Sequence, residues 1–375
     1  MNPELFIGMI SGTSRDGVDA ALVSFKHDRP KIHAALCAPY PPDLAAKLQQ
    51  AILTGRRPED DTLAELDREL AEEFSRTVHL LLEKAGIPAR EVQAIGSHGQ
   101  TVWHDPDGPR PESIQLGNPQ QIAEQTGIDT VGDFRRADIE AGGQGAPLAP
   151  LLHRALFRPD SGLDSACRIV VNLGGIANIS VIDQAGQVSG YDTGPANCLL
   201  DAWVQEHLQE PFDRDGNWAA SGRKISSLLQ EMLADPYFHK PAPKSTGVEY
   251  FNLSWLQGFK PEGPGKAPSD PADVQATLSE LTAITVADEI RPHAPNDVLL
   301  CGGGVHNSDL CLRLQKQLPG IDVKSTADFG LDPDWVEAVL FAWLARESLA
   351  GRLLDTRNIT GAENPVLLGF VARPR

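Results

Sequence analysis

The sequence predicts an α/β protein made of two related halves, and two observations lead to this prediction. A strand, a glycine-bearing polar turn and a second strand occur near the start of the chain and again near its middle. The four strand-like runs are residues 5–10, 18–25, 168–175 and 177–183. Segments with helical periodicity separate and follow these runs, and strands mixed with crossover helices are typical of an α/β fold.

Further elements complete each half. The helical segments are residues 43–54, 61–86, 117–126 and 334–350. The additional strands are residues 92–99, 128–133 and 297–301. A chain of 375 residues suggests two domains, which we expect at residues 1–135 and 136–354. The C-terminal segment, about residues 355–375, is a candidate to return to the first domain. We expect the proline- and glycine-rich segment of about residues 236–270 to be a surface excursion.

The composition is that of a globular protein with an acidic surface. Hydrophobic residues make up 41% and charged residues 22%, and 33 Lys plus Arg stand against 51 Asp plus Glu, a formal charge of −18. An acidic surface repels a phosphate backbone, so we expect no nucleic-acid partner and no binding to an anionic membrane. The five cysteines are scattered, and we recognise no leader and no membrane-spanning run, so we expect a cytoplasmic protein.

Three glycine clusters at predicted strand ends are the main candidates for chemistry. The sequence has no GxxxxGKS or GxxxxGKT loop and no GxGxxG after its first strand, which disfavours a standard phosphate loop and a dinucleotide-dependent dehydrogenase. Backbone N–H groups beside glycines can approach phosphate oxygens closely, so two such turns could hold a polyphosphate without the usual lysine. The alternative is that these glycines only turn the chain.

The three clusters resemble the nucleotide motifs of a known superfamily. The turn from Gly12 to Asp19, the turn from Asn172 to Ser180 and the glycines 302–304 resemble the first phosphate, second phosphate and adenosine motifs of the sugar kinase, actin and heat-shock ATPase superfamily. Within it the chain is similar to the anhydro-N-acetylmuramic acid kinase family. The segments that carry this similarity run over nearly the whole chain and include MISGTSRDGVDA, SHGQTVWH, VNLGGIANIS, YDTGPANCLLD, KSTGVEYFNLSWL, LLCGGGVHN and DPDWVEAVLFAWLA. The resemblance implies a two-domain actin-like ATPase fold (ribonuclease H-like), with duplicated halves and an active-site cleft between the domains.

The resemblance also implies a reaction. ATP and water would convert 1,6-anhydro-N-acetylmuramic acid into N-acetylmuramic acid 6-phosphate and ADP, with Mg²⁺, in peptidoglycan recycling. The residues that it assigns to the nucleotide are Gly12, Thr13, Ser14, Arg15, Asp16, Gly17, Val18, Asp19, Asn172, Gly174, Gly175, Gly302, Gly303 and Gly304. Asp16 is the expected residue for the hydrated metal, with Asp19 as the second candidate and an Asx turn as the structural alternative. Arg15 stands where we expect leucine in the family, and its role stays open.

Two carboxylates are the catalytic candidates. Asp192, at the end of a predicted strand, falls on the general base of the family, and a carboxylate can take a proton from water that attacks an anomeric carbon. Its alternative role is a helix N-cap. Glu337, one turn into a predicted helix, falls near the substrate in the family. Its alternative role is a solvated glutamate favoured by the helix dipole.

Four residues are the candidates for binding the sugar: Gln100, Asp133, Arg135 and Asn178. Gln100 ends a strand and can bind hydroxyl groups. Arg135, from Gly-Asp-Phe-Arg-Arg, is our choice for the lactyl carboxylate because a planar guanidinium can form two parallel bonds to it. The segment from Lys244 to Asn252 has Val248 where we expect arginine in the family, so we leave it out of the catalytic set.

Other functions remain as alternatives to this small-molecule kinase. An ordinary hexose or amino-sugar kinase of the same superfamily would need no water, because the sugar hydroxyl itself attacks ATP. A non-kinase actin-like ATPase, such as a chaperone module, should carry a peptide-binding appendage, for which the length leaves little room. A carbohydrate-binding protein without nucleotide would leave the glycine turns unexplained. The resemblance leaves a homodimer as a further expectation.

Overall fold

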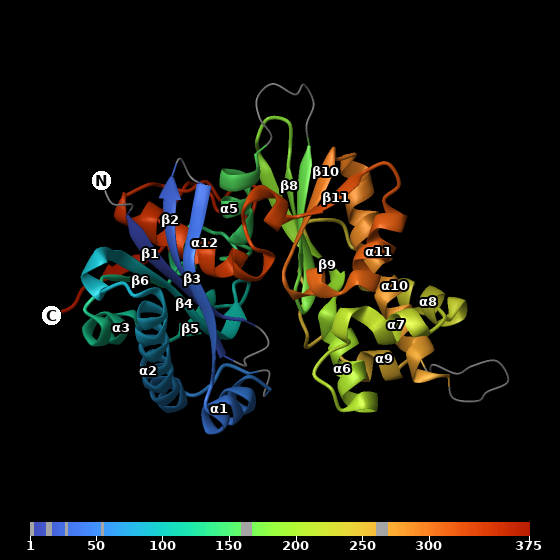
Figure 1. Ribbon diagram of the computed structural model, residues 1–375, viewed down its shortest axis with the longest axis horizontal. Coiled ribbons are helices and arrows are strands. Elements are labelled where there is room, and N and C mark those ends of the chain that lie inside the picture. Colours follow the sequence, from blue (N-terminus) through green and yellow to red (C-terminus); the bar gives the residue numbers. More distant parts are fainter. Residues whose placement is uncertain (1–3, 13–16, 27–28, 54–55, 159–166, 260–268) are drawn as a thin grey trace. The chain divides into compact units, whose positions relative to one another are not determined.

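The computed structural model describes residues 4–12, 17–26, 29–53, 56–158, 167–259 and 269–375 (Figure 1). The chain divides into two compact units: unit 1 comprises Met1–Leu156 with Trp335–Arg375, and unit 2 comprises Phe157–Asp334. This division differs from the boundaries that we expected after residues 135 and 354. Residues 136–156 and the helix that follows residue 335 belong to unit 1, because that helix packs on the unit 1 sheet.

Unit 1 is built on a seven-stranded sheet with the order β12-β6-β4-β1-β2-β3, and β5 pairs with β4. The strands are β1 (Leu5–Ser11), β2 (Gly17–Lys26), β3 (Arg29–Pro39), β4 (Val92–Asp105), β5 (Glu112–Leu116), β6 (Thr130–Gly132) and β12 (Phe370–Ala372). β1, β2 and β3 are antiparallel neighbours, whereas β4 runs parallel to β1 and to β6. β12 pairs with β6, so the C-terminal segment does join the first half.

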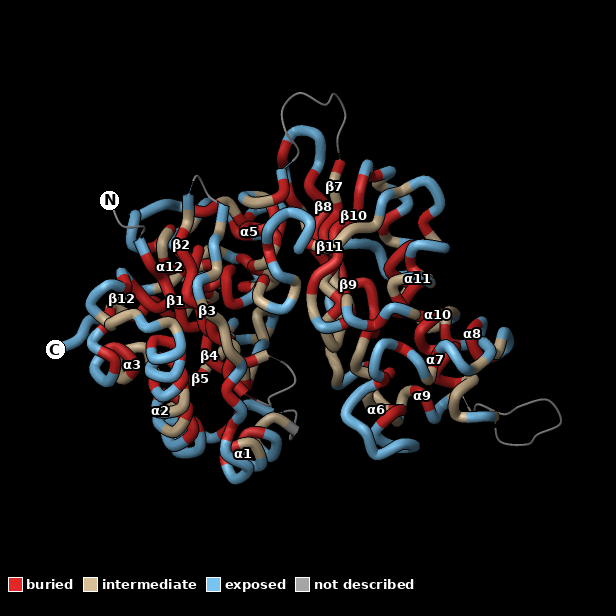
Figure 2. The backbone as a smooth tube through the Cα atoms, viewed as in Figure 1, coloured by how far each residue is buried: buried red, intermediate tan, exposed pale blue. Residues whose placement is uncertain are grey.

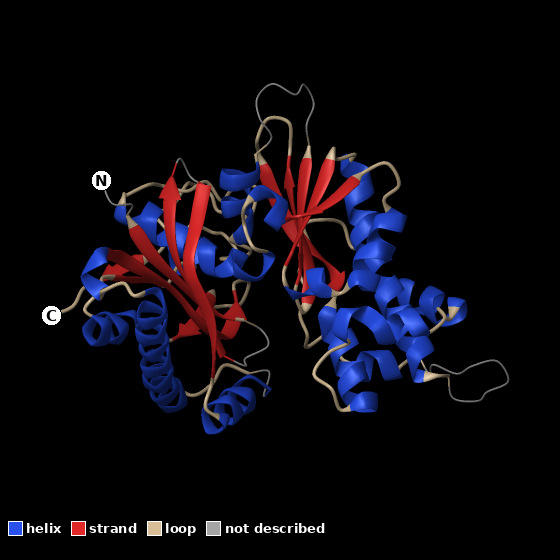
Figure 3. Cartoon of the chain, viewed as in Figure 1, coloured by secondary structure: helices blue, strands red, loops and turns tan. Residues whose placement is uncertain are grey.

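Unit 1 also contains helices, several of which pack on its sheet (Figure 3). They are α1 (Pro42–Leu53), α2 (Asp60–Ala85), α3 (Pro119–Thr126), α4 (Arg136–Glu140), α5 (Ala149–Phe157) and α12 (Val336–Leu349), with a short 3₁₀ turn at Ala89–Glu91. α12 approaches β1 and β4 closely because each strand has a glycine at the contact. A Cβ on Gly8 would lie 1.8 Å from the Ala338 carbonyl oxygen, and one on Gly96 would lie 1.9 Å from that of Phe341.

Unit 2 repeats the core of this topology. Its five-stranded sheet has the order β11-β10-β7-β8-β9, formed by β7 (Arg168–Leu173), β8 (Ile176–Ile182), β9 (Val188–Pro195), β10 (Asp297–Cys301) and β11 (Asp322–Ser325). β7, β8 and β9 are antiparallel neighbours, and β10 is parallel to β7 and to β11. The order and directions match those of β1, β2, β3, β4 and β6. The expected α/β fold with duplicated halves is therefore confirmed.

Helices of unit 2 surround one long buried helix, α10 (Pro271–Ile290). The others are α6 (Asn197–Leu208), α7 (Asn217–Ser221), α8 (Ser226–Leu233), α9 (Leu253–Gln257) and α11 (Ser308–Gln317). Short 3₁₀ turns occupy Arg214–Gly216, Pro236–His239, Arg291–His293, Gly303–His306, Thr326–Phe329 and Pro333–Trp335. Each unit has its own hydrophobic core, seen as the buried stretches of Figure 2.

The prediction of a surface excursion at residues 236–270 is wrong for the described part of that segment. Tyr237, Phe251 and Leu256 are at most 1% exposed and belong to the unit 2 core. Their rings pack on one another, with Tyr237 and Phe251 centroids 5.4 Å apart. The aromatic residues thus fold this proline- and glycine-rich segment back onto the unit. Within the described residues, no helix is long and apolar enough to cross a membrane.

Candidate active site

A row of polar side chains crosses the unit 2 sheet at the end of three strands. Asn172 of β7 lies opposite Asn178 of β8, and Asn178 lies opposite Asp192 of β9. Residues directly opposite each other in antiparallel strands project from the same face, with Cβ atoms about 4.5–5.5 Å apart. The sheet register therefore brings together three residues that the sequence analysis had taken from two separate motifs.

Hydrogen bonds from Ser245 and Thr246, which come about fifty residues later in the chain, hold the Asp192 carboxylate. Its Oδ2 accepts hydrogen bonds from the Ser245 hydroxyl at 3.1 Å and from the Thr246 backbone N–H at 3.0 Å. Burial raises the pKa of Asp192 to about 6, although both hydrogen bonds act to lower it. The α6 N-cap is Ala196, so Asp192 does not cap that helix. The structure leaves Asp192 as an oriented carboxylate whose pKa lies near neutrality.

The glycine clusters of unit 2 meet beside this row. A Cβ on Gly302, which has φ +80°, would lie 2.3 Å from the Asn172 Oδ1, and a Cβ on Gly304 would lie 2.6 Å from the Leu173 Cβ. A Cβ on Gly303 would meet nothing within 4 Å. The Gly174 and Gly175 carbonyls accept the backbone N–H groups that start α6. Two of the predicted nucleotide motifs therefore pack together, Gly302 and Gly304 against Asn172 and Leu173, and Gly303 leaves open backbone that a ligand can approach.

The first phosphate turn is described only at its two ends. Thr13, Ser14, Arg15 and Asp16 lie outside the described residues. Gly12 follows β1, and Gly17 and Val18 are buried at the start of β2. Gln100 does not end its strand, as we expected, but lies inside β4, which continues to Asp105. The Ser11 hydroxyl donates to the Gln100 Oε1 at 2.6 Å, so Gln100 links β4 to the strand that enters the turn. Gln100 is only 3% exposed, and its Nε2 donates to the Thr101 carbonyl at 3.1 Å.

Glu337 stands in the first turn of α12, and its side chain is exposed. Removal of water by the surrounding protein raises the pKa of its carboxyl, the Asp19 carboxylate raises it further, and the Arg135 guanidinium lowers it. The exposed surface and the raised pKa fit a carboxyl that reaches solvent from a recess. Within unit 1, the charges of Asp19 and Arg135 thus both lie close enough to Glu337 to change its pKa.

Arg135 is held by internal contacts. Its Nε and Nη2 donate to the His98 Nε2 at 3.1 and 2.8 Å, and its Nη1 donates to the Gly145 carbonyl at 2.8 Å. Because the His98 Nε2 accepts, its Nδ1 carries the proton and donates to the Gly99 carbonyl. Burial lowers the pKa of Arg135 to about 10, opposed by Glu337 and Asp138, so the guanidinium remains charged at neutral pH.

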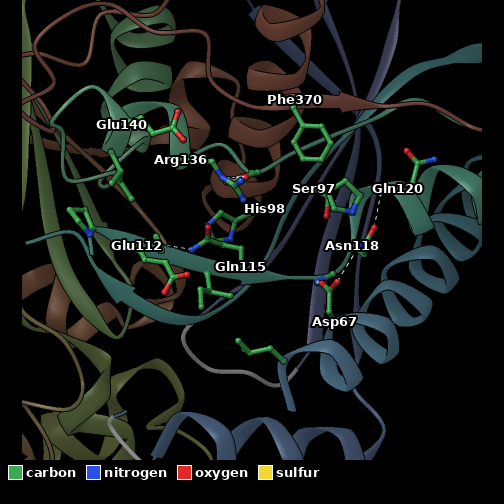
Figure 4. A pocket seen from close by; sticks show the side chains of 18 of the residues that line it. Asp67, Ser97, His98, Glu112, Gln115, Asn118, Gln120, Arg136, Glu140 and Phe370 are labelled. Carbon is green, nitrogen blue, oxygen red and sulfur yellow. Dashed lines mark hydrogen bonds and ion pairs between the residues drawn. The ribbon is translucent and has the colours of Figure 1, made fainter. Parts of the chain in front are cut away.

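Asp133 and Arg136 lie on a cavity of about 710 Å³ in unit 1, together with Ser97, Gln115, Asn118 and Phe370 (Figure 4). An ion pair of 2.6 Å joins Asp133 to Arg136. Asp133 has φ +54°, a backbone conformation that few residues other than glycine adopt. The Ser97 hydroxyl is buried and has no hydrogen-bond partner among the described residues. The cavity has polar and apolar walls in similar measure, and the charges of Asp133 and Arg136 are paired.

The sequence analysis missed four residues that shape the site. Ser245 and Thr246 belong to KSTGVEYFNLSWL, which we left out because of Val248, and His98 belongs to SHGQTVWH. Asp138 is also buried, and it accepts from the Gly145 N–H at 2.7 Å and from the Thr360 hydroxyl at 2.7 Å. Ser245, Thr246 and His98 lie in segments that carry the family resemblance, which could have drawn attention to them. The sequence of a segment does not show, however, which group each of its residues binds.

Carboxylates are the candidate ligands for a metal ion. Within the described ranges, no group of three or more His, Cys, Asp or Glu side chains could hold a metal ion. Hydrated Mg²⁺ needs only one or two carboxylates, and the neighbouring Asp19 and Glu337 carboxylates supply that kind of donor. The residues present are thus compatible with such an ion, while Asp16 lies outside the described residues.

Comparisons with known proteins agree on one family. The family model described as anhydro-N-acetylmuramic acid kinase matches residues 4–374. A protein named anhydro-N-acetylmuramic acid kinase from Xanthomonas campestris pv. campestris (strain 8004) is 48% identical over 373 residues, which cover 98% of this chain and 97% of that protein. The protein of the same name from Xanthomonas axonopodis pv. citri (strain 306) is 48% identical over 375 residues, with the same shares covered.

Solved structures with a similar fold are more distant. An activator of the 2-hydroxyisocaproyl-CoA dehydratase from Clostridium difficile is 12% identical with a TM-score of 0.45, and the match covers 92% of this chain and 97% of that one. A ROK family glucokinase from Streptomyces griseus is 15% identical with a TM-score of 0.42, covering 92% and 99%.

Proposed function

We propose, because the chain belongs to the anhydro-N-acetylmuramic acid kinase family, that it opens 1,6-anhydro-N-acetylmuramic acid with water and phosphorylates the freed O6 with ATP. The products are N-acetylmuramic acid 6-phosphate and ADP. The observation that carries the proposed mechanism is the Asp192 carboxylate, which two hydrogen bonds orient and whose pKa is about 6. Such a group is ionised at neutral pH and remains basic enough to take a proton.

Asp192 acts on the water. In the anhydro sugar, O6 is bonded to C1 and has no proton, so it cannot attack ATP until the C1–O6 bond weakens. Asp192 takes a proton from water as the water oxygen bonds to C1, and the C1–O6 electron pair stays with O6. O6 then bonds to the γ-phosphorus as the bond to ADP breaks. Glu337 supplies negative charge near the positive character that develops at C1.

The glycine surface of unit 2 is suited to bind the nucleotide. Gly303 leaves its backbone open to close approach, whereas Gly302 lets the Asn172 side chain pack against the chain at 2.3 Å from where a Cβ would stand. We assign the same role to Gly12, Gly17 and Val18 at the ends of the first turn. Mg²⁺ would supply positive charge for the phosphates and for the ADP oxygen that separates from the γ-phosphorus. We assign its positioning to Asp16, with Asp19 as the described alternative.

The sugar residues divide into direct and supporting roles. Arg135 is proposed to hold the lactyl carboxylate, with His98 and Gly145 fixing its direction. Asp133 and Asn178 are proposed to accept or donate to the sugar hydroxyl and acetamido groups. Gln100 is now proposed to support the first phosphate turn through Ser11, because its amide is buried and already bonded.

One assay tests this function against an ordinary hexose kinase. The protein is incubated with Mg-ATP and either 1,6-anhydro-N-acetylmuramic acid, glucose or N-acetylglucosamine, and ADP is measured. We expect ADP only with the anhydro sugar. In H₂¹⁸O, one label should appear at C1 of the phosphorylated sugar when sampled soon after turnover, and none in the bridging O6. Turnover of glucose at a comparable rate, or label in the bridge, would exclude the mechanism.

A further inference from the structure

We infer that Lys244 is a positioning residue for Asp192, because it fixes the short segment whose Ser245 and Thr246 hold the Asp192 carboxylate. The inference rests on the proposed role of Asp192 as the base. Lys244 is the one buried residue of the described stretch 239–245, and its side chain is only 2% exposed. Lysine is almost never buried unless its charge is paired. Lys244 is therefore the point at which this exposed stretch is attached to the interior of unit 2.

The Lys244 ammonium is paired with Glu289, near the end of α10. Its Nζ lies 2.6 Å from the Glu289 Oε1 and donates to the Phe238 carbonyl at 3.3 Å. The Glu289 side chain is 21% exposed, so water and salt screen this pair less than a pair on the open surface. Most residues of α10 are buried. The ion pair therefore connects the exposed stretch to a fixed element of the unit 2 core.

Lys244 also contacts the groups that hold the Asp192 backbone. Its own carbonyl accepts the Asp192 backbone N–H at 3.0 Å. The Tyr237 hydroxyl donates to the Asp192 carbonyl at 2.9 Å, and the Lys244 Nζ lies 5.1 Å from the centroid of the Tyr237 ring. A cation at that distance is attracted to the face of an aromatic ring. Lys244 thus supplies one hydrogen bond to the Asp192 backbone and contacts the residue that supplies another.

The Asp192 carboxylate depends on where this segment lies. Ser245 is exposed, so its hydroxyl can turn to water unless the main chain beside it is fixed. Burial and the Glu249 carboxylate raise the pKa of Asp192, whereas the hydrogen bonds from the segment lower it. A segment released from α10 would lose these hydrogen bonds, and the pKa of Asp192 would rise.

Glu289 also acts on the residue that precedes Asp192. Burial raises the pKa of the Tyr191 hydroxyl, and the charge of Glu289 and a hydrogen bond to it raise that pKa further. The Tyr191 hydroxyl lies 3.2 Å from the His293 Nε2, and burial lowers the His293 pKa, opposed by Glu289. Burial, Asp192 and Glu289 likewise raise the pKa of Tyr237. Because His293 titrates in the acid range as well, the experiment must observe the Asp192 carboxyl itself.

The test follows the Asp192 carboxyl carbon by NMR in the full chain, labelled with ¹³C-aspartate, and the signal absent from Asp192→Asn assigns it. Two variants break the ion pair: Lys244→Met keeps the length of the side chain without its charge, and Glu289→Ala removes the partner. In both we expect the titration midpoint of Asp192 to rise by about 0.5–1 pH unit, because hydrogen bonds to the ionised form weaken. Melting curves confirm that each variant is folded, and Glu289→Ala carries the test alone if Lys244→Met does not fold.

Each variant has a control that removes the same charge. Lys240→Met removes an exposed lysine whose Nζ lies 5.6 Å from the centroid of the same Tyr237 ring. Asp288→Ala removes an exposed acid next to Glu289. Salt largely screens surface charges, so both controls should move the midpoint by less than about 0.2 pH unit. A shift in the controls as large as in the two variants would mean that net charge sets the Asp192 pKa, and it would overturn the inference.

The sign of the shift in Glu289→Ala separates position from charge. Loss of an anion would by itself lower the pKa of Asp192, whereas release of the segment raises it. An unchanged or lowered midpoint in this variant would therefore overturn the inference, whatever its activity. We also expect kcat to fall by about 10-fold or more in both variants, because a displaced base is poorly aligned with the water. A raised midpoint with wild-type kcat would support the positioning of Asp192 and exclude Asp192 as the base, so the two proposals can fail separately.

Discussion

The two units share one strand order and use it to position a carboxylate in different ways. In unit 1, α12 lies directly on the backbone of β1 and β4 because Gly8 and Gly96 have no side chain, and this fixes the start of α12, where Glu337 stands. In unit 2, the end of β9 is held by side chains: Thr282 of α10 donates to the Pro195 carbonyl at 2.9 Å. Close backbone packing positions Glu337 in unit 1, whereas a side-chain hydrogen bond holds the end of β9, the strand of Asp192, in unit 2.

The largest expected effect comes from removing the close approach in unit 1. Gly8→Ala or Gly96→Ala would place a Cβ less than 2 Å from a carbonyl oxygen of α12. Because the clashing atom belongs to the helix backbone, the whole helix would have to move to relieve the clash. We expect a loss of at least about 3 kcal/mol of stability, at the upper end for overpacking, or no soluble protein. Gly303→Ala is the matched control, because its Cβ meets nothing within 4 Å. Denaturant unfolding measures the three variants, and equal midpoints would contradict the packing argument.

The next effect separates chemistry from folding in unit 2. Asp192→Asn should lower kcat by at least about 100-fold, since general-base assistance is lost. Its Tm should hold or rise slightly: the pKa of Asp192 is raised to about 6 by burial, so its ionised form destabilises the folded state at neutral pH. Steady-state kinetics and thermal melts are compared on the same preparation. Retention of most wild-type turnover would remove Asp192 from the mechanism.

Adjacent arginines test the sugar site of unit 1. Arg135→Ala should raise the KM for the anhydro sugar by about 10- to 100-fold, because a charged hydrogen bond is lost. The KM for ATP should stay within about 3-fold of the wild-type value. Arg136→Ala serves as the control, because Arg136 is exposed and pairs with Asp133. A larger effect of Arg136→Ala on the sugar KM would transfer the carboxylate contact to Arg136 and to the cavity of Figure 4.

The smallest expected effect is a shift in pH dependence. The base must be ionised, so kcat/KM should fall on the acid side of pH 6, about tenfold for each further unit. The Ser245 hydrogen bond lowers the pKa of Asp192, so Ser245→Ala should move the acid limb to higher pH. Ser254→Ala, in α9, is the control for loss of a serine hydroxyl that makes no hydrogen bond to Asp192. An acid limb that stays in place in Ser245→Ala would mean that another group controls it.

The doubled topology could be predicted from the sequence because the strand and turn pattern is local and occurs twice. β3 was missed because it is a half-exposed edge strand, whose exposure alternates without a continuous apolar run. The division of the chain was missed because α12 joins unit 1 through glycines far away in sequence. Asp192 was predicted as a base, but its partners Ser245 and Thr246 could not be, because a contact over some fifty residues leaves no spacing pattern.

The division of the chain has a consequence for biosynthesis. Unit 2 is one continuous stretch, whereas unit 1 receives α12 and β12 from the end of the chain. Domains fold as they leave the ribosome, so unit 2 can complete its core while the first 156 residues still lack a helix and an edge strand. Thr360, whose hydroxyl donates to the Asp138 carboxylate, is 222 residues further along the chain than Asp138. Unit 1 can therefore complete its fold only after the whole of unit 2 has been made.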